Sequence, residues 1–205
     1  MRMLFLVPCL LLVFPVPALA KTDAAKEAPK KVAVITPEME AVSLFGRACV
    51  QTRGDLTKVT SQLANLEKGQ VADKLTAEEA AKATGHNTQH AWVMQSPVSQ
   101  QKLLISKDED GSCNLFIHRG NPNGVREEFR RLAVWDAVQQ KSKLGAKTKT
   151  KDADGVPLTL DYYEVLTADK SKRPMYILSS AAKPKGDTQF LLTYKTIESK
   201  IAAPK

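Results

Sequence analysis

Few side chains in this sequence are spaced to bind a metal. His86 and His90 stand four residues apart in the segment HNTQH, and on a helix this spacing places two metal ligands on one face. However, Gly85 is expected to end a helix just before them, and the only other histidine is His118. A closed zinc site needs four nitrogen or sulfur ligands. We therefore interpret His86 and His90 as polar loop residues, and we predict neither a metal site nor a cofactor.

The cysteines indicate a disulfide in an exported protein. Cys9 falls within an apolar run, 4–19, that follows a basic start and ends in small residues, as in a secretory signal peptide cleaved after Ala20. Cleavage there leaves Cys49 and Cys113 as an even pair in an oxidising compartment, which predicts a bond between them. The alternative is two free buried thiols, since no Cys-x-x-Cys pair supports a redox site.

Patterns typical of catalysis are weak. Gly-x-Ser-x-Gly and the glycine-rich phosphate motifs are absent. Neighbouring carboxylates occur as Asp108-Glu109-Asp110, as Glu127-Glu128, and as Asp152 with Asp154, and all three groups are typical of turns or solvated helix faces. We predict no catalytic residues. A small periplasmic hydrolase that assembles its Asp, Glu or His side chains in space is an alternative.

Lysine is the most distinctive surface residue. The chain has 30 Lys and Arg against 22 Asp and Glu, a net charge of +8, and removing Arg2 with the signal peptide makes it +7. Lys147, Lys149 and Lys151 alternate along an expected strand and share one face, so they are candidate anion-binding residues. The alternative is a solvated edge strand whose lysines prevent aggregation. No aromatic residues interleave with them, so nucleic-acid binding is not expected.

The elements that hold these residues predict an α+β fold. Thr36-Pro37 is typical of a helix start, with Cys49 on the buried face, and Asp55 and Thr76 are expected to begin two more short helices. A longer helix is expected from 121 to about 142. Strands are expected at 91–94, 102–105, 113–117, 145–151, 156–167, 175–180 and 188–195. We predict an antiparallel sheet with the long helix across one face and a short N-terminal helical cap at an end or edge.

The length of 205 residues and a hydrophobic fraction of 43% exclude a disordered chain. We expect a flexible leader at 21–35, with a short strand possible at 32–35, one domain at 36–200 and a disordered tail at 201–205. No segment after the signal peptide is long and apolar enough to cross a membrane. Trp92 and Trp135 are expected core residues, and Tyr162 and Tyr163 are expected on opposite faces of a strand.

The segment from Phe45 through Cys49 to Gly54-Asp55 resembles a pattern of small exported proteins of proteobacteria. In that functionally uncharacterised family, Phe-x-x-x-Cys stands near the mature start, a Gly-Asp helix break follows, and a second cysteine lies in a later β-hairpin, as Cys113 does here. The resemblance implies a periplasmic location and a disulfide, and it carries over no catalytic residue.

We therefore expect an exported envelope binding or accessory protein without catalytic activity, whose partner is an envelope protein or an anionic surface. Besides the hydrolase, the second alternative is a protein that binds anionic envelope surfaces through a lysine-rich face. The oligomeric state and the roles of His86, His90 and His118 are left open.

Overall fold

The computed structural model describes residues 34–66, 70–86, 88, 90–153, 155–167, 172–185 and 188–198. They belong to one of two compact units of the chain, Val34–Lys205. The expected signal peptide, the leader up to residue 33 and the tail 201–205 lie outside the described residues. Val34 and Ile35 are exposed and belong to no strand, so the strand expected at 32–35 is absent from its described half.

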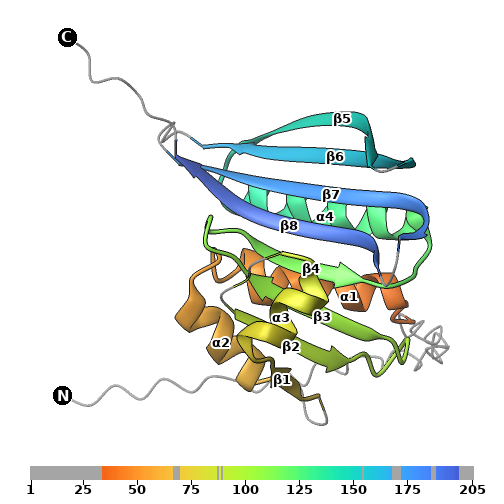
Figure 1. Ribbon diagram of the computed structural model, residues 1–205. Coiled ribbons are helices and arrows are strands. Elements are labelled where there is room, and N and C mark those ends of the chain that lie inside the picture. Colours follow the sequence, from red (N-terminus) through yellow and green to blue (C-terminus); the bar gives the residue numbers. More distant parts are fainter. Residues whose placement is uncertain are drawn as a thin grey trace, which may run out of the picture. The chain divides into compact units, whose positions relative to one another are not determined.

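The described residues form one antiparallel sheet of eight strands in the order β1-β2-β3-β4-β8-β7-β6-β5 (Figure 1). The strands are β1 (Ala72–Lys74), β2 (His90–Gln95), β3 (Lys102–Lys107), β4 (Cys113–Ile117), β5 (Lys143–Ala153), β6 (Val156–Leu166), β7 (Lys172–Lys185) and β8 (Thr188–Glu198). Two meanders, β1 to β4 and β5 to β8, are joined where β4 pairs with β8. The predicted fold class is confirmed, and β1 is a strand that the sequence did not predict.

The helices begin where the sequence predicts. They are α1 (Pro37–Phe45), the π-helical turn η1 (Gly46–Val50), α2 (Leu56–Ala64), α3 (Ala77–Thr84) and α4 (Pro122–Gln139). The α-helices start after Thr36, Asp55, Thr76 and Asn121, respectively, and each of these side chains accepts a hydrogen bond from a backbone N–H of the first turn. The π-helical turn was not expected, and it buries Ala48, Cys49 and Val50 in succession.

One face of the sheet is covered by α1 and α4, which lie side by side, while α3 lies on the opposite face (Figure 1). The three short helices expected to form one cap at an end or edge of the sheet are therefore separated, with α1 beside the long helix and α3 on the opposite face. Gly46 makes this approach possible, because a Cβ atom there would lie only 3.1 Å from the Leu132 side chain of α4.

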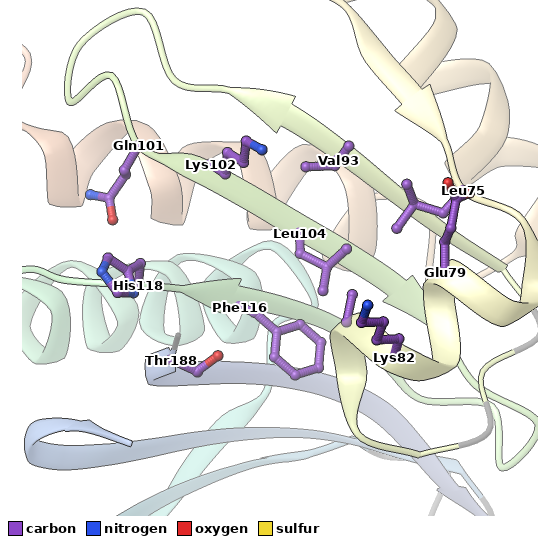
Figure 2. A pocket seen from close by; sticks show the side chains of 11 residues that line it. Leu75, Glu79, Lys82, Val93, Gln101, Lys102, Leu104, Phe116, His118 and Thr188 are labelled. Atoms are coloured by element: carbon purple, nitrogen blue, oxygen red, sulfur yellow. The ribbon is translucent and has the colours of Figure 1, made fainter. Parts of the chain in front are cut away.

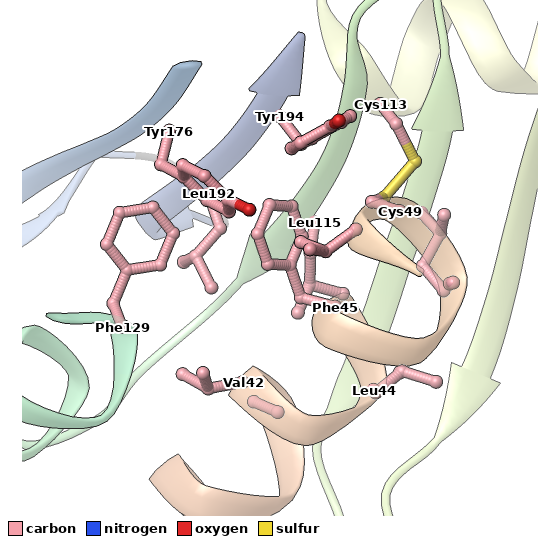
Figure 3. Packing of buried hydrophobic residues seen from close by; sticks show 14 of the residues in the cluster. Val42, Leu44, Phe45, Cys49, Cys113, Leu115, Phe129, Tyr176, Leu192 and Tyr194 are labelled. Atoms are coloured by element: carbon pink, nitrogen blue, oxygen red, sulfur yellow. A yellow bond between two sulfur atoms is a disulfide. The ribbon is translucent and has the colours of Figure 1, made fainter. Parts of the chain in front are cut away.

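The core lies between these helices and the sheet (Figure 3). Aromatic rings form its centre, with Phe45 and Phe129 5.8 Å apart and Tyr176 and Tyr194 5.3 Å apart between ring centroids. Cys49 of η1 is bonded to Cys113 of β4 at the edge of this cluster, with the two Cα atoms 5.5 Å apart. The predicted disulfide thus connects the N-terminal helices to the middle of the sheet.

A buried carboxylate ties three elements together within this core. Asp136 of α4 pairs with both terminal nitrogens of Arg53, at 2.9 and 3.0 Å, and accepts a hydrogen bond from the Tyr176 hydroxyl of β7. Burial, followed by this hydrogen bond, raises the pKa of Tyr176 above its ordinary value, so the phenol stays a donor. Arg53 has a positive φ of 56°, which is uncommon for a residue other than glycine.

The prediction for the tryptophans is correct at one position and wrong at the other. Trp92 of β2 is buried against the helices, as expected. Trp135 is 45% exposed, because it lies on the outer side of α4 with Val134 and Val138, which no described element covers. Its helical position next to the core-facing Asp136 turns it away from the sheet.

Replacing both disulfide cysteines, Cys49→Ala with Cys113→Ala, should lower the free energy of unfolding by about 4 kcal/mol, because 64 residues separate the linked positions. Denaturant unfolding of the double variant measures this change. A reducing agent should destabilise the wild type by a similar amount and leave the variant unaffected. An unchanged unfolding midpoint in the variant would show that the bond does not stabilise the fold.

Removing the buried carboxylate, Asp136→Ala, should lower the free energy of unfolding by about 2 to 3 kcal/mol, because it leaves the buried Tyr176 hydroxyl and the Arg53 guanidinium without their partner. Tyr194→Phe is the matched control, because the Tyr194 hydroxyl makes only a long hydrogen bond of 3.4 Å to Arg53. This variant should lower the free energy of unfolding by less than about 1 kcal/mol. Equal losses in the two variants would contradict the proposed role of Asp136.

Candidate functional site

The face of the sheet opposite α1 and α4 carries a row of mostly apolar side chains. Strand register aligns, from β2 to β5, Val93, Leu104, Phe116, Leu191, Ser179, Leu160 and Lys149. Phe116 is buried, and the other apolar side chains of the row are half-buried. This face is therefore apolar enough to require a cover, but among the described helices only α3 supplies one.

A hollow of about 700 Å³ lies between α3 and the β2–β4 end of this row (Figure 2). Val93, Leu104 and Phe116 form its floor, while Leu75 and Ala83 line its α3 side. Its polar lining consists of Glu79, Lys82, Gln101, Lys102, His118 and Thr188. A volume of this size and an apolar floor with polar side chains at its rim are typical of small-molecule binding sites.

The wall helix α3 is held at both of its ends. At its start, Thr76 and Glu79 form the predicted capping box, in which the Thr76 backbone N–H and hydroxyl donate to Glu79 Oε2 at 2.9 and 2.8 Å. At its end, Gly85 adopts a φ of +75° and stops the helix, as expected. His86 then links this end to the sheet, because its Nε2 lies 3.0 Å from Asp108 Oδ2 in the β3–β4 turn.

The three histidines take separate places. Both ring nitrogens of His86 have protein partners, since Nδ1 lies 3.1 Å from the Thr84 carbonyl oxygen. His90 begins β2 and stacks on Trp92, with ring centroids 6.2 Å apart, and His118 lines the hollow. His86 and His90 are thus not on one helical face, and in the described part of the chain no cluster of three or more His, Cys, Asp or Glu side chains is suited to a metal ion.

Asp108 is the centre of a polar cluster. It accepts hydrogen bonds from the Thr88 hydroxyl at 2.9 Å and from the Asn114 amide at 2.7 Å, besides its pair with His86. The Ser112 hydroxyl also donates to Asp108, at 3.3 Å. A histidine, a carboxylate and a serine therefore meet here, but the serine contacts the carboxylate and not the imidazole, so this is not the order of a nucleophilic triad.

Ser99 and Lys102 have the Ser-x-x-Lys spacing of some acyl-transfer enzymes. They flank the turn between β2 and β3, where the Ser99 hydroxyl donates to Ser96 Oγ at 2.8 Å. Lys102 instead lines the hollow.

The predicted lysine row lies away from the hollow, on the same face of the sheet. Lys147, Lys149 and Lys151 point to one side of β5, which is an edge strand. The Lys149 ammonium lies 5.7 Å from the centre of the Tyr162 ring, beside a depression of about 300 Å³ that also contains Glu164. The edge position is the one expected if these lysines prevent strand pairing.

The hollow was not predicted from the sequence. Its signal was present, because Leu103-Leu104-Ile105 and Leu115-Phe116-Ile117 place apolar side chains on both faces of neighbouring strands. A sheet with one helical layer leaves the second of these faces uncovered.

Comparisons with known proteins leave the hollow to be interpreted from its own geometry. No protein-family model matches this chain, and no match was found among curated proteins or solved structures. The resemblance to small exported proteins therefore stays a prediction. Among the helices of the described residues, none has the length and apolar character needed to cross a bilayer.

Neutralising Glu79 should loosen α3. The hydrogen bonds from the backbone N–H and hydroxyl of Thr76 lower the pKa of Glu79 below its ordinary 4.5, so the stabilisation is present above pH 4.5 and is lost as the pH falls through the lowered pKa. At neutral pH, Glu79→Gln should raise amide hydrogen exchange in α3 a few-fold, and the difference from the wild type should disappear in acid.

Glu78→Gln is the matched control, because Glu78 is exposed in the same turn and outside the capping box. It should leave exchange in α3 near the wild-type rate. The same acceleration from both substitutions would show that the charge of the first turn, and not the capping box, holds the helix.

Proposed function

We propose that this chain is an exported binding protein without catalytic activity, and that its ligand occupies the hollow between α3 and the sheet. Export is supported by the signal-like segment 1–20 and by the disulfide of Cys49 with Cys113, which suits an oxidising compartment. The binding role rests on the hollow itself.

The observation that carries the proposal is the way α3 covers the apolar row. In α3, Ala80 is almost completely buried, whereas Ala83, one turn later, is exposed and lines the hollow. The helix therefore contacts the sheet along one side and stands away from Leu104 and Phe116 along the other. Apolar surface left in this way is stabilised when a ligand removes it from water.

The two alternatives have less support. For a hydrolase, the Asp108 cluster lacks a nucleophile in contact with His86, and Glu79 in the hollow is already bonded to Thr76. For a protein that binds anionic surfaces, the lysine row of β5 lies where lysines also protect an edge strand. The depression beside the lysine row, about 300 Å³, has less than half the volume of the hollow.

Filling the hollow tests the proposal. The neutral fluorescent probe N-phenyl-1-naphthylamine should bind the wild type saturably, because it can cover the apolar floor without needing a charge partner. Ala83→Phe places a ring into the hollow from an exposed helix position, and it should weaken probe binding by about tenfold or more, as judged by fluorescence titration.

Ala77→Phe is the matched control, since Ala77 is exposed in the first turn of α3 and does not line the hollow. It should bind the probe like the wild type. The proposal fails if the wild type shows no saturable binding, or if Ala83→Phe binds as well as Ala77→Phe.

A further inference from the structure

We propose that the ligand of the hollow is a single-chain amphiphile with an anionic head group, whose alkyl chain lies along the apolar row. This inference rests on the proposed binding function and names the ligand class. It follows from the shape of the floor and from the charges at its rim. These charges also disfavour a segment of this chain or a second copy as the occupant.

The floor is a narrow track that crosses the strands. Val93, Leu104 and Phe116 stand on three adjacent strands, and Leu191 continues the same line onto β8, just outside the residues that line the hollow. Because adjacent strands are about 4.8 Å apart, the track from Val93 to Leu191 is about 14 Å long and suits an alkyl chain of about ten to twelve carbons. Phe116 and Leu104 lie together in the middle of it (Figure 2). A single extended chain covers such a track more completely than a compact ring system does.

The rim of the hollow carries a net positive charge. Lys82 reaches the hollow from α3 and Lys102 reaches it from β3, on the two sides of Leu104 (Figure 2). Within the described part of the chain, neither ammonium group is paired with a carboxylate. The acidic member of the lining, Glu79, is bonded to Thr76 and offsets only one of the two lysine charges. An anionic head group within reach of the two lysines would offset the remaining charge.

The polar groups at the other end of the hollow are less suited to a head group. The side chain of Gln101 is held by the backbone of Arg119, since its amide donates at 3.0 Å and its oxygen accepts at 3.1 Å. Gln101, His118 and Thr188 therefore close that end of the floor (Figure 2). We place the head group at the rim above Leu104, within reach of Lys82 and Lys102, and the tail along the track from Leu104 over Phe116.

Charge also disfavours occupants that are parts of this chain. The segment 21–31 has four lysines against two acidic residues, and the segment 199–205 contains two lysines and no acidic residue. A second copy would present the same net positive charge. A cationic segment next to Lys82 and Lys102 would be repelled, whereas a carboxylate or phosphate would be attracted.

Displacement of N-phenyl-1-naphthylamine by twelve-carbon amphiphiles of different charge tests the inference. Below their micelle concentrations, laurate or dodecyl phosphate should displace the probe at concentrations at least about tenfold lower than dodecylammonium. Comparing these two anions separates a carboxylate from a phosphate source. Lys82→Gln with Lys102→Gln should weaken binding of the better anion by about tenfold and leave the affinity for the neutral probe unchanged.

Lys147→Gln with Lys149→Gln is the matched control, because it removes the same charge from the same face of the sheet outside the hollow. It should leave anion affinity near the wild-type value. Equal displacement by dodecylammonium and the anions, or equal losses in both double variants, would overturn the ligand class while probe binding persists. Absence of probe binding to the wild type would instead overturn the binding function, and this inference with it.

Discussion

The central strand β4 buries all five of its side chains, so it has to be covered from both sides of the sheet. Cys113, Leu115 and Ile117 face α1 and α4, and the disulfide to Cys49 fixes η1 against them. Asn114 and Phe116 face the other way. Because β4 also joins the two meanders through β3 and β8, the helices, the sheet and the hollow are all positioned by the burial of this strand.

The two sides are covered by different means. On the helix side, aromatic packing and the Asp136 ion pair leave little space, as expected of a close-packed core. On the other side, the buried Asn114 donates to Asp108 and accepts from the Thr193 hydroxyl, so this polar neighbour of the row has its own partners. The short helix α3 is attached at its two ends and covers only part of Phe116 and Leu104. The space beneath it is thus a consequence of how the sheet is covered.

Features set by local sequence were predictable, and those set by distant contacts were not. Thr36, Asp55 and Thr76 mark helix starts because each side chain accepts a hydrogen bond from a backbone N–H of the first turn that follows it. The disulfide was indicated by the signal-like segment, whose removal leaves two cysteines. By contrast, β1 consists of only three residues, Ala72-Asp73-Lys74, held by pairing with β2, and it is too short to show a periodic signal. The prediction for Trp135 was wrong because apolar side chains of α4 extend around the helix beyond the side that packs on the sheet. The hollow depends on α3 folding back over strands that follow it in sequence.

The most direct test of this account is to locate a bound amphiphile by nuclear Overhauser effects between the alkyl protons of laurate and the side chains of the protein. If the alkyl chain lies in the hollow, contacts to Leu104, Phe116 and Ala83 are expected. Contacts confined to Val134, Trp135 and Val138 on the outer side of α4, where apolar side chains are also exposed, would contradict this placement.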